Sequence, residues 1–320
     1  MHTIFKEIGN IGVIPVIKID NAEHAVPLAL ALASGGIPCA EITFRTAAGE
    51  EAIRRIARDV PGVLAGAGTV LNIDQADRAI AAGAKFIVSP GLNPKVVAHC
   101  IEKNIPVIPG CSTPSDIDQA LDFGLEVVKF FPAEQAGGIE YIKAISAPYS
   151  NVLFIPTGGI NASNIGSYLA FNKVLACGGS WMVAADIINS GDFAKISALS
   201  RQALFSALGL RIAYIGINAG TKKAAVQAAA IFGALFPVVD STNFVFAADT
   251  VRIAKHKEPG KHGQLVIGAP SMPRTLAYLE RLSIEAASET FEKDGKGNIC
   301  AFYLREEILG FAVQFIQRCI

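Results

Sequence analysis

A lysine stands inside an apolar run that has the character of a β-strand. Lys129 lies within Val127–Phe131, and Pro132 closes the run. Lysine is rarely buried in full, so its presence there needs a physical explanation. It could mark a strand end from which the amine reaches water along its own methylenes. It could instead be a buried amine that attacks carbonyl carbons and forms an iminium.

Other polar side chains stand at the ends of neighbouring strand-like runs. Glu41, Thr43 and Arg45 alternate along one run and therefore share a face, while Thr69 ends the next run. A carboxylate beside an iminium-forming lysine can take a proton from a substrate hydroxyl and return one to carbon. For Glu41 the alternative is a plain ion pair with Arg45 or Lys129.

Two pairs of glycines form a third group, in Thr157–Gly159 and Gly178–Ser180. Each pair ends a strand-like run and is followed by the start of a helix-like segment. Glycine lets the backbone approach an anion closely, and the amides that follow can point at it. A single pair would indicate only a turn, but two pairs at adjacent strand ends predict a phosphate site.

Eight short apolar runs alternate with amphipathic, helix-like segments along this part of the chain. The runs are Val13–Ile19, Cys39–Arg45, Leu64–Val70, Phe86–Pro90, Pro106–Cys111, Val127–Pro132, Phe154–Gly159 and Leu175–Gly179. Eight such units are typical of a (β/α)8 TIM barrel, an α/β fold with its active site at the C-terminal strand ends. An open doubly wound sheet is the alternative, but its GxGxxG turn does not follow the first run. The barrel therefore brings the lysine, glutamate, arginine and paired glycines to one rim.

These motifs resemble those of the 2-keto-3-deoxy-6-phosphogluconate (KDPG) aldolase / 4-hydroxy-2-oxoglutarate (KHG) aldolase family. The matching segments are Glu41–Thr46, Gly66–Val70, Val128–Glu134, Pro156–Ile160 and Gly178–Met182. The resemblance implies a class I aldolase of the Entner–Doudoroff pathway, which is a carbon–carbon lyase. It implies that KDPG is cleaved to pyruvate and glyceraldehyde 3-phosphate, with no cofactor.

The resemblance also assigns roles to individual residues. It implies that Lys129 forms the Schiff base, that Glu41 moves protons, and that Arg45 and Thr69 hold the carboxylate of the pyruvate part. The other substrate-binding residues that it implies are Pro90, Phe131, Thr157, Gly158, Gly159, Gly178, Gly179 and Ser180. Two alternatives stay open: the same chemistry mainly on KHG, which lacks a phosphate, and a phospho-sugar-binding protein without catalysis. The family further implies a homo-oligomer, commonly a trimer.

Composition restricts the partners and the compartment. Acidic and basic residues balance at 28 each, so neither nucleic acid nor an anionic membrane surface is expected as a partner. The cysteines have no close pairing: they are Cys39, Cys100, Cys111, Cys177, Cys300 and Cys319. Scattered thiols and an N-terminus unlike a signal peptide predict a cytoplasmic protein.

The pattern changes near Gly209, which predicts an aldolase domain over residues 1–208 and a smaller α+β domain over residues 209–320. Two βαβββ repeats are expected in the second domain. Their strands are Arg211–Asn218, Val238–Thr242, Phe244–Lys255, Gln264–Gly268, Glu285–Phe291 and Asn298–Gln317, and their helices are Thr221–Leu235 and Pro273–Leu282. Asp294–Asn298 has the composition of a hairpin turn.

This duplicated pattern resembles the vicinal oxygen chelate (glyoxalase-like) fold, whose enzymes bind a divalent metal. Gln264 and Gln314 alone would make a poor site, because hard divalent ions need several charged or imidazole ligands, so no metal is expected. A structural or oligomerising role is favoured over a ligand sensor for this domain.

Overall fold

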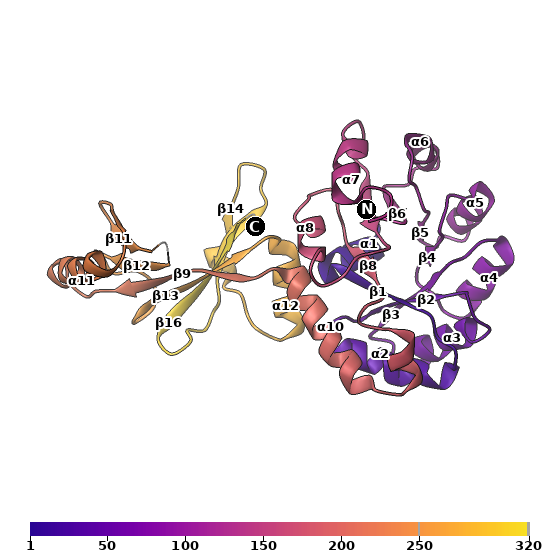
Figure 1. The fold of residues 1–320 in the computed structure, drawn as a ribbon, viewed down its shortest axis with the longest axis horizontal. Coiled ribbons are helices and arrows are strands. Elements are labelled where there is room, and N and C mark those ends of the chain that lie inside the picture. Colours follow the sequence, from indigo (N-terminus) through magenta and orange to yellow (C-terminus); the bar gives the residue numbers. More distant parts are fainter. Residues whose placement is uncertain (249, 319–320) are drawn as a thin grey trace. The chain divides into compact units, whose positions relative to one another are not determined.

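The computed structural model describes residues 1–248 and 250–318 and divides the chain into two compact units, Met1–Ala207 and Leu208–Ile320 (Figure 1). Cys319, one of the six scattered cysteines, lies outside the described residues. Within the described ranges, the other cysteines form no disulfide with one another, and no helix is long and apolar enough to cross a membrane.

The first unit contains eight parallel strands that alternate with helices, as the sequence predicts. They are β1 Val13–Ile17, β2 Cys39–Thr43, β3 Leu64–Gly68, β4 Ile87–Val88, β5 Val107–Ile108, β6 Val127–Phe130, β7 Leu153–Pro156 and β8 Cys177–Gly179. Six strands pair in the order β5-β4-β3-β2-β1-β8, and β6 pairs with β7. Single parallel bridges, Gly110–Lys129 and Thr157–Gly178, join this pair to its neighbours. Pairing therefore passes from each strand to the next and returns from β8 to β1.

The α/β class with a parallel sheet is thus confirmed, but seven of the eight strands end earlier than the sequence predicts, while β8 ends at the predicted Gly179. Arg45, Val70, Cys111 and Gly159 all lie beyond the last residue of their strands. Beyond the regular strands some single backbone hydrogen bonds remain, from the Val70 amide to the carbonyl of Val88 and from the Cys111 amide to the carbonyl of Lys129. Small and apolar loop residues continue the strand-like pattern, so the sequence does not mark where the hydrogen bonding stops.

Helices follow the strands in the first unit. They are α1 Thr3–Ile11, η1 Ala22–His24, α2 Ala25–Ser34, α3 Gly49–Asp59, α4 Ile73–Ala81, α5 Pro94–Glu102, α6 Pro114–Asp122, α7 Gly138–Ser146, α8 Ile165–Leu169, α9 Ala185–Asn189 and α10 Phe193–Leu208. Side-chain caps start several of them. Asn93 accepts a hydrogen bond from the amide of Lys95, and Thr113 forms a capping box with Asp116. Helix α1, which precedes the first strand, is not predicted from the sequence.

Strands β1 to β8 pair in a closed order, which we call the strand circle. Glycines in β3 leave room for larger neighbours inside it. A Cβ atom added to Gly66 would lie 2.2 Å from the ring of Phe86. One added to Gly68 would lie 2.3 Å from a carboxylate oxygen of Glu41. Strand β3 therefore supplies the space that a buried ring and a buried carboxylate occupy.

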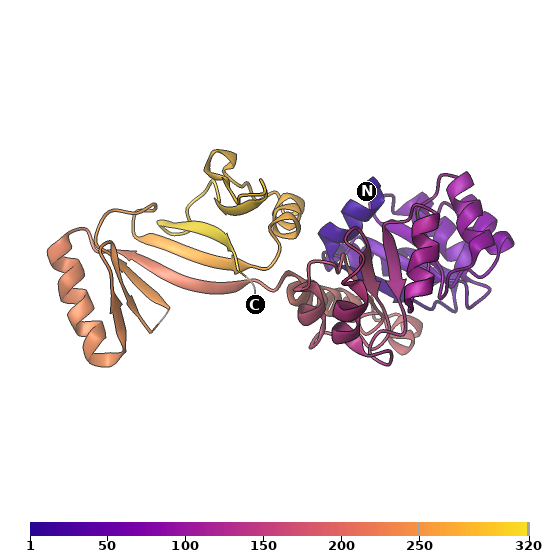
Figure 2. The ribbon, with the colours of Figure 1, turned by 90° about the horizontal axis from the view of Figure 1, so that it is seen from above.

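The second unit has one eight-stranded sheet in the order β10-β11-β12-β9-β13-β16-β15-β14 (Figure 2). Its elements are β9 Arg211–Asn218, α11 Lys222–Leu235, β10 Val238–Asp240, β11 Phe244–Ala247, β12 Val251–Ala254, β13 Gly263–Ala269, α12 Met272–Arg281, η2 Ser288–Thr290, β14 Glu292–Lys293, β15 Ile299–Tyr303 and β16 Phe311–Gln317. Each half runs strand, helix and three strands, and the first strands of the two halves, β9 and β13, pair antiparallel at the centre.

Three strand expectations in the second unit are wrong. Asn298–Gln317 is not one strand but the antiparallel pair β15 and β16. Phe244–Lys255 is not one strand but the antiparallel pair β11 and β12. Glu285–Phe291 contains a single bridge, between Ala286 and Leu304, and the turn η2. Between β14 and β15 the expected hairpin turn is present, with the Asp294 carboxylate accepting hydrogen bonds from the amides of residues 296 and 298.

Candidate active site

Lys129 and Glu41 face each other inside the strand circle of the first unit. They lie on β6 and β2, which are four places apart in a circle of eight, so their inward side chains come from opposite sides. Lys129 Nζ is 3.6 Å from Glu41 Oε1. The two residues are only 6% and 2% exposed, respectively. A buried amine and a buried carboxylate thus form a close pair.

One oxygen of this carboxylate has no hydrogen-bond donor. Glu41 Oε1 is buried and accepts no hydrogen bond within the described part of the chain. Leaving such an oxygen unsatisfied costs about 1–3 kcal/mol of stability, and more for a charged group. The oxygen that faces the amine is therefore available to a proton on a molecule bound there.

The backbone around Lys129 is fixed on both sides. Its amide donates to the carbonyl of Pro109, and its carbonyl accepts from the amide of Cys111, both at 2.8 Å. On the other side, β6 pairs with β7. The amine lies 5.3 Å from the centre of the Phe131 ring, which is within cation–π distance. The strand and the ring together hold the amine in place.

Arg45 and Thr69 meet at the mouth of this site. Arg45 Nε donates a hydrogen bond of 3.3 Å to Thr69 Oγ1. Thr69 has a φ of +57°, in the left-handed region that threonine seldom adopts. Arg45 therefore pairs with Thr69 and leaves Glu41 to Lys129. Thr43 lies deeper, where its hydroxyl donates to the carbonyl of Ile17 at 2.8 Å.

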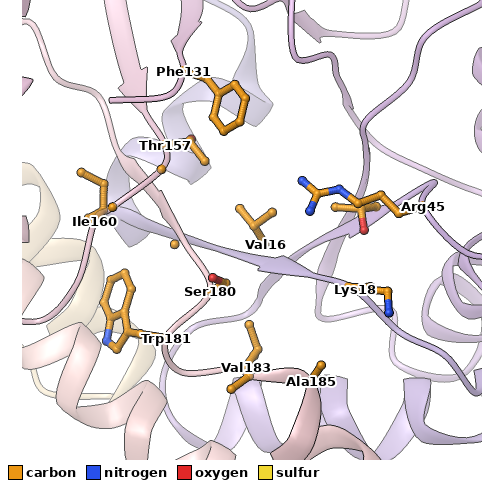
Figure 3. Close-up of a pocket in the computed structure, with 15 residues that line it drawn as sticks. Val16, Lys18, Arg45, Phe131, Thr157, Ile160, Ser180, Trp181, Val183 and Ala185 are labelled. Carbon is orange, nitrogen blue, oxygen red and sulfur yellow. The ribbon is translucent and has the colours of Figure 1, made fainter. Parts of the chain in front are cut away.

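A cavity of about 500 Å³ opens at the C-terminal ends of the strands (Figure 3). The predicted site residues that line it are Arg45, Phe131, Thr157, Gly158, Gly159, Gly179 and Ser180. In Figure 3 the Arg45 guanidinium extends into the cavity from one side, while Phe131 and Thr157 lie on another. Guanidinium, hydroxyl and backbone groups thus share one cavity.

The other predicted site residues are absent from this lining: they are Lys129, Glu41, Thr69, Pro90 and Gly178. Lys129 reaches the cavity wall through its contact with Phe131. A Cβ atom on Gly178 would lie 2.3 Å from Thr157 Oγ1, so this glycine makes room for the hydroxyl.

The two glycine pairs differ in their physical basis. Gly158 and Gly159 have φ values of +99° and +80°, so their backbone favours glycine. Gly179 has an ordinary φ, but a Cβ there would lie 1.9 Å from the ring of Trp181. The first pair therefore shapes a loop, and the second allows close packing.

Several lining residues are not among the predicted site residues: they are Val16, Lys18, Ile160, Trp181, Val183, Ala184 and Ala185. Lys18 is exposed and forms an ion pair of 3.0 Å with Asp20. Val16 and Lys18 alternate along the first apolar run just as Glu41 and Thr43 do along the second, and this spacing could have identified them. For Val183–Ala185 the sequence holds no comparable pattern.

The chain matches the family described as "KDPG and KHG aldolase" over residues 4–199. The chain belongs to this family. Curated members have closely similar sequences. A "2-dehydro-3-deoxy-phosphogluconate aldolase" of Treponema pallidum is 53% identical over 204 residues, which are 64% of this chain and 97% of the relative. A "KHG/KDPG aldolase" of Escherichia coli K12 is 47% identical over 192 residues, which are 60% of this chain and 90% of the relative.

A solved KDPG aldolase structure has the same fold over the matched part. It is the enzyme of Legionella pneumophila, with pyruvate captured as a covalent carbinolamine intermediate. The TM-score is 0.60 and the sequence identity 39%, over 62% of this chain and 97% of the other. In each comparison nearly the whole KDPG aldolase corresponds to about three-fifths of this chain.

Proposed function

We propose that Lys129 and Glu41 are the catalytic pair of a class I aldolase that cleaves KDPG to pyruvate and glyceraldehyde 3-phosphate. The observation that supports this most is the buried Nζ–Oε1 pair at 3.6 Å. The pairing that runs from β1 to β8 and back to β1 supports a (β/α)8 barrel, and the neighbouring cavity lies at the C-terminal strand ends, where such barrels carry their sites.

The reaction begins when Lys129 Nζ attacks the keto carbon, C2, of the substrate. Loss of water then gives an iminium. Glu41 takes the proton of the C4 hydroxyl, the C3–C4 bond breaks, and its electrons flow into the iminium to form an enamine. The aldehyde product leaves. A proton returned from Glu41 to C3 restores the iminium, and water releases pyruvate and the free amine.

Two groups at the cavity would hold the ends of the substrate. Arg45, with Thr69 beside it, is suited to the carboxylate, because a guanidinium binds carboxylates through directed N–H groups. Gly158, Gly159 and Ser180 are suited to the phosphate, since they bring backbone and a hydroxyl to the same cavity.

Trapping of the iminium tests the role of Lys129. Borohydride added with pyruvate should fix one pyruvate to the wild-type chain, with the modified peptide containing Lys129 by mass spectrometry. Lys129→Ala should give no adduct and no activity, whereas Lys95→Ala, at an exposed lysine on α5, should match the wild type. Full labelling of Lys129→Ala would refute the assignment.

The E. coli relative is named for both substrates, which favours KHG as a second substrate. The proposed phosphate site predicts that kcat/KM is higher for KDPG than for KHG, and steady-state kinetics with both compounds measures this ratio. Equal values would mean that the glycine pairs serve only the fold.

For the second unit we propose a vicinal oxygen chelate-like fold with a structural or oligomerising role. Its support is the repeated order of strand, helix and three strands around the central β9–β13 pair.

A further inference from the structure

Tyr168 is a buried tyrosine whose hydroxyl is committed to one partner. It lies on α8, is 1% exposed, and donates a hydrogen bond to Glu134 Oε1. Burial, and then the nearby carboxylate, raise the pKa of the Tyr168 hydroxyl, so it stays protonated and remains a donor at neutral pH. Glu134 itself lies in the exposed turn that follows β6.

The glycine loop after β7 rests on Glu134. The Glu134 amide donates to the carbonyl of Gly158 at 3.1 Å, and the Ala133 amide donates to the carbonyl of Thr157 at 2.8 Å. The Glu134 side chain packs against the same loop: a Cβ atom added to Gly159 would lie 2.5 Å from Glu134 Cγ. Because Gly158 and Gly159 have no side chains, this contact is part of what supports them.

We propose that Glu134 and Tyr168 are positioning residues for the phosphate of the substrate. This inference rests on the phosphate site proposed above. The buried hydroxyl holds the carboxylate, and the side chain so held supports Gly158 and Gly159. The hydrogen bond also keeps the negative charge of Glu134 directed at Tyr168. A released carboxylate beside the loop would repel a phosphate. Neither residue acts on the atoms that react at Lys129.

The test compares Tyr168→Phe with Tyr149→Phe. Tyr149 is a matched control, because its hydroxyl donates to Asp118 at 2.9 Å on the surface of the same unit, away from the cavity lining. For Tyr168→Phe we expect the KM for KDPG to rise about three- to tenfold, the scale of one ordinary hydrogen bond, since the lost bond reaches the phosphate only through the loop. The kcat for KDPG and the KM for KHG should stay within about twofold of the wild type. Tyr149→Phe should leave all these values unchanged.

Variants at Glu134 keep the test decisive if Tyr168→Phe does not fold. Glu134 is exposed, so Glu134→Ala can be made without a buried cavity and should reproduce the selective rise in KM. Glu134→Gln keeps an oxygen that accepts from Tyr168 and should recover most of the wild-type KM. Equal losses on KDPG and KHG would overturn the inference, because they would indicate a general effect on folding.

Measurements on the wild type distinguish a failure of this inference from a failure of the proposed phosphate site. If wild-type activity on KHG is not inhibited by inorganic phosphate and KDPG has no kinetic advantage, the proposed phosphate site is wrong. If the wild type shows both effects and the Tyr168 and Glu134 variants keep them, the phosphate site stands and the positioning role is wrong.

Discussion

The position of the Glu41 carboxylate depends on the lack of a side chain at Gly68. The Cβ position of Gly68 overlaps the carboxylate, at 2.3 Å from Oε1 and 2.8 Å from Cγ. The backbone of Gly68 is not in the left-handed region, so only space explains this glycine. A methyl group there must push the carboxylate away from Lys129.

We therefore predict that Gly68→Ala lowers kcat about ten- to hundredfold, because a displacement on the order of 1 Å is enough to cost that much. Gly62→Ala is the control, since a Cβ atom there meets nothing within 4 Å. Steady-state kinetics should be read beside thermal unfolding of both variants. A Gly68→Ala enzyme with wild-type kcat would mean that the position of Glu41 does not limit the reaction.

The sequence predicts the chemistry of single residues better than their pairing. Alternation along β2 places Glu41 and Thr43 on one face, but Arg45 lies beyond the strand, where alternation no longer holds. Whether Glu41 pairs with Arg45 or Lys129 therefore depends on how the strand ends bend. Local sequence patterns do not determine the distances between side chains on opposite strands of the β1–β8 circle.

At the scale of single elements, the start of α6 connects a helix cap to the cavity. The Asp116 carboxylate accepts from the amides of Ser112 and Thr113, and Thr113 caps the helix. Ser112 Oγ in turn donates to the carbonyl of Phe131 at 2.9 Å, next to a residue of the cavity lining. The cap therefore fixes more than its own helix.

We predict that Thr113→Ala lowers the free energy of unfolding of the first unit by about 0.5–2 kcal/mol, the usual cost of a lost N-cap. Urea unfolding measures this change. Ser115→Ala, at an exposed serine two residues further on, should stay within about 0.5 kcal/mol of the wild type. Equal losses in the two variants would show that the capping box contributes nothing specific.

Caps and strands differ in how far they can be predicted. A cap such as Asn93 or Thr113 can be recognised in a short stretch of sequence, because it bonds to an amide two or three residues away. A strand end depends on a partner strand far along the chain, so the predicted runs continue past the true ends. Between β11 and β12, Ala248 has a φ of +49°, in the left-handed region that alanine seldom adopts, and the apolar residues on both sides made this segment resemble one strand.

At the scale of the whole molecule, the chain consists of two units with separate cores. The family match ends at residue 199, and the first unit ends at Ala207. The second unit has hydrophobic clusters of its own, one of which includes Phe302 and Phe315. The change of pattern near Gly209 is visible in the sequence because helix-and-strand alternation gives way to runs of strands.

We predict that a chain ending at Gly209 keeps kcat/KM for KDPG within about threefold of the full chain, since domains with their own cores fold alone. Calorimetry should show two transitions for the full chain and one for the shortened chain. Light scattering on both would test the oligomerising role. If the shortened chain folds but loses activity or changes its subunit number, the second unit contributes to the enzyme.

The burial of Lys129 also determines which reagents can modify it. Lys18 at the cavity and Lys95 on α5 are exposed, whereas Lys129 is 6% exposed behind the Phe131 ring. A bulky amine-reactive ester should acylate the surface lysines and leave Lys129 intact. A compact keto acid should instead react with Lys129 and leave the surface lysines unmodified, because an iminium at an exposed amine is readily hydrolysed by water. For a reagent that labels Lys129 in a complex mixture of proteins, small size should therefore matter more than high reactivity.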